Sequence, residues 1–264
     1  MKIFLQVLLI FAILYFLNPL AFEKFDNGKG SIDNLTHKEL PICEINNDNE
    51  WISSNPDDPI SSPISGWEPP FNGKKWNIGG NVQKYNNCYA YAFNNLKQDR
   101  SSKPSPGNTI NDAISFSMLK KKNKKYFTCK DVENRLFRDN PKAFKTHFNS
   151  KCPEKFNKVF LAVSKEPNTD FHFYRQDNPC DIPPSVDGDI AADLNNKCRD
   201  NPTICNEVSY WSHKPGSLKC TNKDASGNII INPLKSDRNY KSYNYKCPCG
   251  FYCVPCEGAE FFSQ

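Results

Sequence analysis

The order of apolar and polar residues divides the chain into three segments. Residues 3–22 contain no charged side chain, residues 23–63 are rich in Asn, Asp, Ser and Pro with no apolar period, and aromatic residues return from about residue 64. Roughly 20 apolar residues span a bilayer as a helix, and a polar segment buries too little apolar surface to fold. The pattern predicts a transmembrane anchor or signal sequence at 1–22, a flexible stalk at 23–63 and a folded domain at 64–264.

Two interpretations of the N-terminal run stay open. Lys2 precedes the run and no net positive charge follows it, which directs the rest of the chain across the membrane. A cleaved signal peptide has an apolar core of about 7–15 residues and a small-x-small site, whereas Pro19 stands two residues before Ala21. We therefore favour a single-pass anchor through residues 3–22, with a secreted form after loss of 1–21 as the alternative. In both cases the domain is exported.

The first part of the domain has the apolar spacing of helices. Residues 89–96 carry apolar side chains at i, i+3, i+4 and i+7, which places them on one helix face, and Asn87 before them is a good N-cap residue. Thr128 and Asp131 form a capping-box-like pair ahead of a second helical pattern.

The second part has the alternation of strands. The predicted strands are 159–163, 170–175, 208–213 and 250–254. Within the second of them, Phe171 and Phe173 point to one face, and His172 and Tyr174 point to the other. Helices first and an antiparallel sheet second define an α+β fold.

Twelve cysteines indicate disulfide stabilisation in an oxidising compartment. Residues 178–206 are rich in Pro, Asp, Asn and Cys, and we expect an insertion pinned by disulfides. Cys247, Cys249, Cys253 and Cys256 at first suggest a metal cluster, but a zinc ribbon needs two Cys-x2-Cys pairs and one is present. Alternation along a strand places the first three on one face, which suits disulfides to different neighbours. We expect neither a metal nor another cofactor.

The charge balance is mild, because 34 Lys and Arg stand against 29 Asp and Glu, for a net charge of +5. The lysine run at 120–125 has no arginine interleaved. A solvated loop explains it better than a polyanion site does. The sequence therefore indicates no nucleic-acid partner.

Candidate chemistry begins at Cys88, which the pattern places in the first turn of a helix. Free backbone N–H groups and the positive end of the helix dipole favour a thiolate there. A reactive thiolate needs an imidazole to share its proton and a third polar group to orient that imidazole. Of four histidines, His172 and His213 lie on predicted strands downstream of Cys88. Papain-like cysteine hydrolases require this order.

Four sequence motifs occur in order along the domain: 86–92 (NNCYAYA), 103–107 (KPSPG), 170–177 (DFHFYRQD) and 211–216 (WSHKPG). Together they resemble a poorly characterised Cys-His domain of bacterial and large-DNA-virus proteins, and the likeness runs from about Trp67 to the C-terminus. The motif order is similar to that of papain-like bacterial cell-wall peptidases.

The resemblance implies a papain-like α+β fold in which N-terminal helices pack on an antiparallel sheet. It implies Cys88 as nucleophile, His172 as general base and His213 as the orienting residue. Three residues of the same motifs are candidate substrate-binding residues: Asn87, Tyr174 and Trp211.

The main hypothesis is an exported, membrane-anchored, papain-like cysteine hydrolase or acyl-transferase. It would act on an amide or ester bond of a peptide-like or cell-wall substrate through an acyl-thioester at Cys88. The alternative is a catalytically inactive, disulfide-rich structural or adhesion protein of a virion or envelope. Asp170 and Asp177 flank His172, and two roles stay open for them: ligands of a cation or substrate, or surface carboxylates beside a turn.

Overall fold

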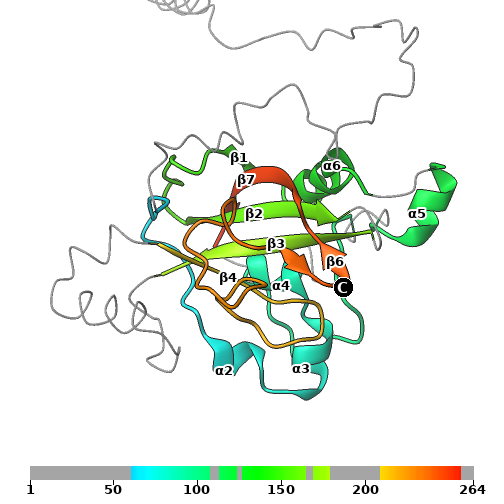
Figure 1. Ribbon diagram of the computed structural model, residues 1–264, viewed down its shortest axis with the longest axis horizontal. Coiled ribbons are helices and arrows are strands. Elements are labelled where there is room, and N and C mark those ends of the chain that lie inside the picture. Colours follow the sequence, from blue (N-terminus) through cyan, green and yellow to red (C-terminus); the bar gives the residue numbers. More distant parts are fainter. Residues whose placement is uncertain (1–60, 108–112, 124–126, 165–168, 179–208, 257–264) are drawn as a thin grey trace, which may run out of the picture. The chain divides into compact units, whose positions relative to one another are not determined.

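The computed structural model describes residues 61–107, 113–123, 127–164, 169–178 and 209–256 (Figure 1). The predicted anchor, nearly all of the predicted stalk and residues 179–206 of the predicted insertion lie outside these residues. The helices are α2 (Gly73–Trp76), α3 (Gly80–Tyr85), α4 (Cys88–Ala92), α5 (Phe116–Lys121) and α6 (Cys129–Asp139). The strands are β1 (Phe144–Thr146), β2 (Phe156–Ser164), β3 (Asp170–Asp177), β4 (Tyr210–His213), β5 (Asn239–Tyr240), β6 (Tyr243–Asn244) and β7 (Cys247–Pro255).

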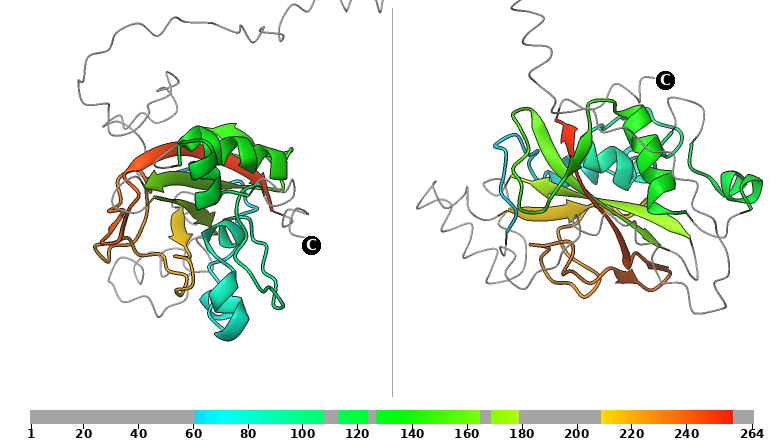
Figure 2. Two further views of the ribbon diagram at one scale, coloured as in Figure 1. Left: turned by 90° about the vertical axis from the view of Figure 1, so that its right-hand side faces the viewer. Right: turned by 90° about the horizontal axis from the view of Figure 1, so that it is seen from above.

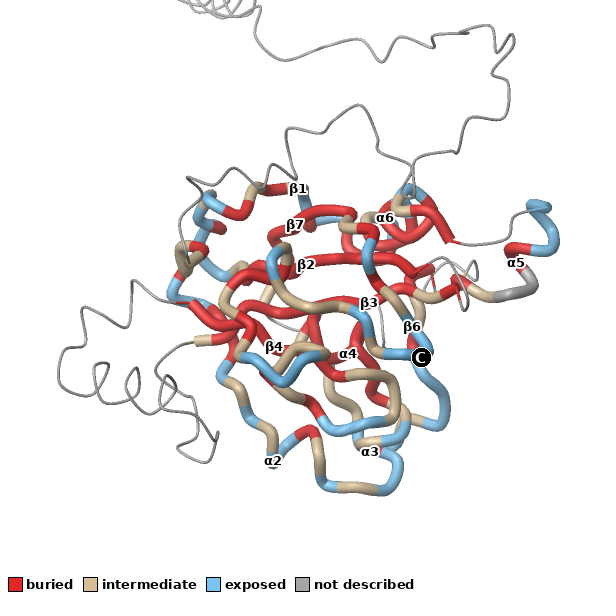
Figure 3. Tube along the Cα trace, in the orientation of Figure 1, coloured by how far each residue is buried: buried red, intermediate tan, exposed pale blue. Residues whose placement is uncertain are grey.

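A five-stranded antiparallel sheet forms the centre of the described structure, in the order β1-β7-β2-β3-β4. The strands predicted at 159–163, 170–175, 208–213 and 250–254 are β2, β3, β4 and the middle of β7. β2, β3 and β7 are buried along almost their whole length (Figure 3).

The alternation along the strands builds two cores, one on each face of the sheet. Phe171 and Phe173 face a core that includes residues of α4 and α6. Tyr174 faces a second core with Phe160 and Trp211, as the sequence predicts. In Figure 2, α6 and the long connection after β4 lie on opposite sides of the sheet. Because both faces are covered, the middle of β2 is a continuous run of buried apolar residues, 159–163.

A β-bulge at Cys249 changes which face the rest of β7 presents. The pairing with β2 skips Cys249, and Gly250 beside it has φ 136°, which a residue with a side chain rarely adopts. Cys247 and Cys249 face the helix-side core, and so does Tyr252 after the bulge. Cys253 therefore points to the opposite face from Cys249, which corrects the expected common face.

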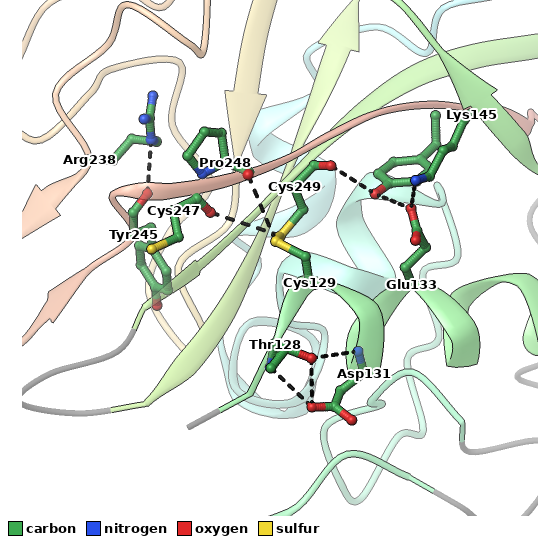
Figure 4. The surroundings of a disulfide bond; sticks show 11 residues. Thr128, Cys129, Asp131, Glu133, Lys145, Arg238, Tyr245, Cys247, Pro248 and Cys249 are labelled. Carbon is green, nitrogen blue, oxygen red and sulfur yellow. Dashed lines mark hydrogen bonds and ion pairs between the residues drawn. A yellow bond between two sulfur atoms is a disulfide. The ribbon is translucent and has the colours of Figure 1, made fainter. Parts of the chain in front are cut away.

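Disulfides link β7 to distant parts of the chain. Cys129 at the start of α6 is bonded to Cys249 (Figure 4), and Cys152 is bonded to Cys253. Cys247 is disulfide-bonded as well. The predicted disulfide stabilisation is confirmed.

The predicted papain-like fold class is wrong. The described residues form mostly antiparallel sheet, and α6, with 11 residues, is the only helix among them longer than six. The helix expected over 89–96 ends at Ala92, because Asn94 adopts φ 50°, a conformation that asparagine tolerates and that ends a helix. The helices that precede the sheet in the described residues are therefore short, and they do not form the papain-like helical layer that the resemblance implied.

Part of the lysine run is helical instead of forming a loop. α5 ends with Lys120 and Lys121, and its N-cap Ser115 accepts a hydrogen bond from the backbone N–H of Met118. Lys120 is exposed to solvent, in agreement with a solvated face.

Candidate thiol–imidazole site

The site begins at the N-terminus of α4. Asn87 is the N-cap residue: its Oδ1 accepts from the backbone N–H of Ala90 at 3.3 Å, and its Nδ2 donates to the carbonyl of Pro104 at 2.8 Å. The predicted N-cap is confirmed, and Asn87 also ties the KPSPG loop to the helix. Cys88 follows as the first helical residue and carries a buried free thiol.

Cys88 lies at the edge of β3 where β4 no longer pairs with it. The β3–β4 register ends at Tyr174 opposite His213. Beyond that point the backbone of β3 is not paired with β4. Cys88 Sγ lies there, 3.9 Å from the carbonyl oxygen of Phe171 and near the N–H of Phe173. The start of α4 thus occupies the edge that a longer β4 would cover.

His172 and His213 form a buried hydrogen-bonded pair. His172 Nε2 lies 2.7 Å from His213 Nδ1, and His213 Nε2 lies 3.0 Å from the carbonyl oxygen of Lys223. A carbonyl only accepts hydrogen bonds, which assigns the proton of His213 to Nε2 and the accepting lone pair to Nδ1; the hydroxyl of Tyr240 lies 3.3 Å from the same Nε2. His172 then donates from Nε2, and its Nδ1 keeps a lone pair. This chain leaves His172 Nδ1 as the basic nitrogen.

A cavity of about 250 Å³ brings the predicted nucleophile and base together. Its wall includes Asn87, Cys88, Lys103, Asp170, His172 and Tyr245. His213 is not part of the wall and contacts the cavity through His172. Among the described residues, Cys88 Sγ makes no hydrogen bond to either imidazole.

Burial keeps the thiol and both imidazoles neutral. Burial, with a smaller contribution from Asp170, raises the pKa of Cys88 to about 12. Burial and then the neighbouring His213 hold the pKa of His172 well below its usual value, and burial lowers the pKa of His213 to about 4. The thiolate expected at the helix N-terminus is therefore absent at neutral pH, because desolvation exceeds the stabilisation that a five-residue helix provides.

Two of the predicted substrate-binding residues lie in the sheet and not in the wall. Tyr174 is buried, and its ring centroid is 4.9 Å from those of both His172 and His213. Trp211 is buried in the second core against Phe251. Tyr174 therefore packs against the histidine pair, whereas Trp211 packs within the core.

Several wall residues were missed as site residues by the sequence analysis. Tyr245 follows β6, and its ring stacks on His172 at 4.8 Å. Lys103 comes from the KPSPG loop and Gly216 from the WSHKPG motif. The two motifs signalled these loops, whereas nothing in the local pattern marked Tyr245.

A buried lysine holds the loop after β4 in place. Lys214 Nζ donates to the carbonyls of Gln83 at 2.6 Å, Gly216 at 3.0 Å and Leu218 at 3.0 Å. Burial lowers the pKa of Lys214 to about 8. Lys214 thereby fixes Gly216 at the cavity rim.

The described residues contain no group of three or more His, Cys, Asp or Glu side chains placed to hold a metal ion. Asp177, which the sequence left as a possible ligand, is buried and pairs with Arg175 at 2.8 Å. Asp177 therefore forms a buried ion pair in the interior of the fold.

Comparison with known proteins gives one line of evidence about the class of protein. No protein-family model matches the chain, and no solved structure matches it. The chain is similar to Insoluble matrix shell protein 1 of Ruditapes philippinarum, with 25% identity over 170 residues, which cover 64% of this chain and 80% of that protein.

The same comparison corrects the predicted single-pass membrane localisation. The relative is named as a shell matrix protein, and within the described part of the chain no helix is both long and apolar enough to cross a bilayer. The predicted span itself, residues 3–22, lies outside the described residues.

Proposed function

We propose that the protein is a secreted structural protein of an insoluble extracellular matrix, stabilised by disulfides. The observation that carries this proposal is the similarity to a shell matrix protein over 80% of that protein's length. The disulfides of β7 are consistent with it, because they suit an oxidising compartment outside the cell. Cys88, His172 and His213 are neutral, and an unreactive thiol is consistent with a structural role.

Extraction of the source tissue tests the structural proposal. An antibody against the described domain should find the protein in the pellet after extraction with detergent and high salt, and reductant should release it. A control protein that is secreted but soluble should leave the pellet in the first extraction. Recovery of this protein in that same soluble fraction would contradict a matrix role.

A second candidate function is acyl transfer at Cys88, which the shared cavity and the hydrogen-bonded histidine pair favour. Lys223 fixes the tautomer of His213, and His213 fixes that of His172, so the Nδ1 lone pair of His172 is ready to take a proton. In this proposal Sγ attacks a carbonyl carbon while the thiol proton moves to His172. The imidazolium then returns the proton to the departing amine or alcohol, which leaves a thioester on Cys88.

Acylation by 4-nitrophenyl acetate tests the second function. At pH 7.5 the wild-type domain should gain one hydroxylamine-labile acetyl group on the Cys88 peptide, detected by mass spectrometry. His172→Gln should slow this reaction by about 100-fold or more. His213→Asn keeps an oxygen that accepts from His172 and should slow it less than His213→Ala.

Cys220→Ser, which removes the other buried free thiol, is the control and should leave the rate unchanged. Acetylation that is insensitive to His172 would exclude acyl transfer.

A further inference from the structure

A carboxylate stands in the cavity wall beside the thiol, and the proposed functions do not use it. Asp170 lines the same cavity as Cys88 and His172. Its Oδ2 accepts from the hydroxyl of Tyr245 at 2.8 Å, and its Oδ1 accepts from the backbone N–H of Phe171 at 2.9 Å. Both donors are neutral. Burial raises the pKa of Asp170, because its charge is only partly compensated there.

No cation is paired with Asp170 within the described part of the chain. The ion pairs found there join Lys122 to Asp131, Lys145 to Glu133, and Arg175 to Asp177. Lys103 also lines the cavity and lowers the pKa of Asp170 from a distance. Its side chain is exposed, so it is free to turn towards solvent when another cation enters.

The rest of the wall suits an organic ammonium group. Phe171, Tyr243 and Tyr245 line the cavity, and aromatic faces attract ammonium ions. A metal ion would need several oxygen ligands, and among the described wall residues Asp170 is the only one with a carboxylate. At about 250 Å³ the cavity is smaller than pockets for larger ligands, which reach roughly 300–1,000 Å³, so it matches a single side chain.

We propose that the cavity binds a primary ammonium group, such as that of a lysine side chain, with Asp170 as its counter-ion. The aromatic wall would enclose the methylene chain, and the hydroxyl of Tyr245 would hold the carboxylate in place. An ammonium ion at Asp170 would also offset the negative charge that disfavours the thiolate of Cys88. Binding itself does not depend on acyl transfer, so the two proposals fail separately.

Titration with n-butylammonium, followed by backbone amide NMR shifts, tests this site. We expect saturable shifts at Thr169, Asp170 and Phe171 with butylammonium, and none with butyrate or butanol at equal concentration. Asp170→Asn removes the charge but keeps one oxygen that can accept from the N–H of Phe171, while its amide N–H can donate to the Tyr245 hydroxyl, and it should weaken binding by about ten-fold or more. Asp99 carries an exposed carboxylate. The variant Asp99→Asn is therefore the matched control and should bind like wild type.

The possible outcomes distinguish failure of the ammonium site from failure of acyl transfer. Asp170→Ser serves as a second variant, and both variants are checked for the wild-type spectrum before titration. Equal affinity in the Asp170 variants, preference for butyrate at Lys103, or the lack of any saturable shift would each overturn the ammonium site. An inert Cys88 in the acetylation assay, with butylammonium binding intact, would overturn acyl transfer alone.

Discussion

The state of a single sulfur depends here on burial more than on its place in a helix. A helix N-terminus stabilises a negative charge by about 0.3–1 kcal/mol. The pKa of Cys88 rises from 9.0 to about 12, which corresponds to about 4 kcal/mol against the thiolate. The helix effect is several-fold too small to overcome desolvation.

Alkylation of Cys88 should follow this raised pKa. Because only the thiolate reacts, the rate with iodoacetamide should be very low at pH 7 and should rise about ten-fold for each pH unit up to pH 10. Asp170→Asn should increase the rate at every pH, since the Asp170 charge raises the thiol pKa, and Asp99→Asn should not. Mass spectrometry of the Cys88 peptide measures both, and rapid labelling at pH 7 would contradict the buried neutral thiol.

The buried histidine pair should make stability fall in acid. His213 has a folded pKa of about 4, below its unfolded value near 6.5, so between these values the unfolded chain binds more protons and stability rises with pH. We expect a loss on the order of 3 kcal/mol from His213 between pH 7.5 and pH 4, measured by urea unfolding.

A double variant tests whether the two buried histidines cause the loss of stability in acid. The double change His172→Gln and His213→Gln should flatten the pH dependence in this window, whatever its effect at pH 7.5. A slope as steep as that of the wild type would assign the acid sensitivity to other groups.

At the level of elements, local signals set where α6 begins. Thr128 Oγ1 accepts from the backbone N–H of Asp131 at 3.1 Å, and Asp131 Oδ2 accepts from the N–H of Thr128 at 3.1 Å. This reciprocal pair is the predicted capping box. Figure 4 shows it one residue from the Cys129–Cys249 bond, so the cap positions the disulfide as well as the helix.

Loss of the cap should have a measurable cost. Thr128→Ala should reduce the free energy of unfolding by about 1 kcal/mol, because two backbone donors lose their partners or their geometry. Thr128→Ser retains the hydroxyl and should lose less than half of that. Chemical denaturation measures both, and equal stability of the two variants would show that the cap contributes nothing.

At the scale of the whole molecule, the disulfides fasten β7 to segments more than 100 residues away in the chain. Cys129–Cys249 spans 120 residues and Cys152–Cys253 spans 101. Closing long loops lowers the entropy of the unfolded chain. β7 lies between β1 and β2 in the sheet, so its attachment stabilises both neighbours.

Removal of one bridge tests this contribution. The double change Cys129→Ala and Cys249→Ala should lower the free energy of unfolding by about 2–4 kcal/mol. Cys220→Ala, which removes a free buried thiol, is the control and should cost about 1 kcal/mol or less. A loss in the double variant no larger than in the control would indicate that the bridge does not constrain the unfolded chain.

The sequence by itself determined the features that depend on neighbouring residues. The caps at Asn87 and Thr128 and the alternation through Phe171 to Tyr174 follow from local hydrogen bonding and the two-residue period of a strand. Tertiary structure decided the rest, because those features depend on packing between distant segments. The bulge at Cys249, the neutral thiol of Cys88 and the place of Asp170 and Tyr245 beside it all depend on what the remainder of the chain buries.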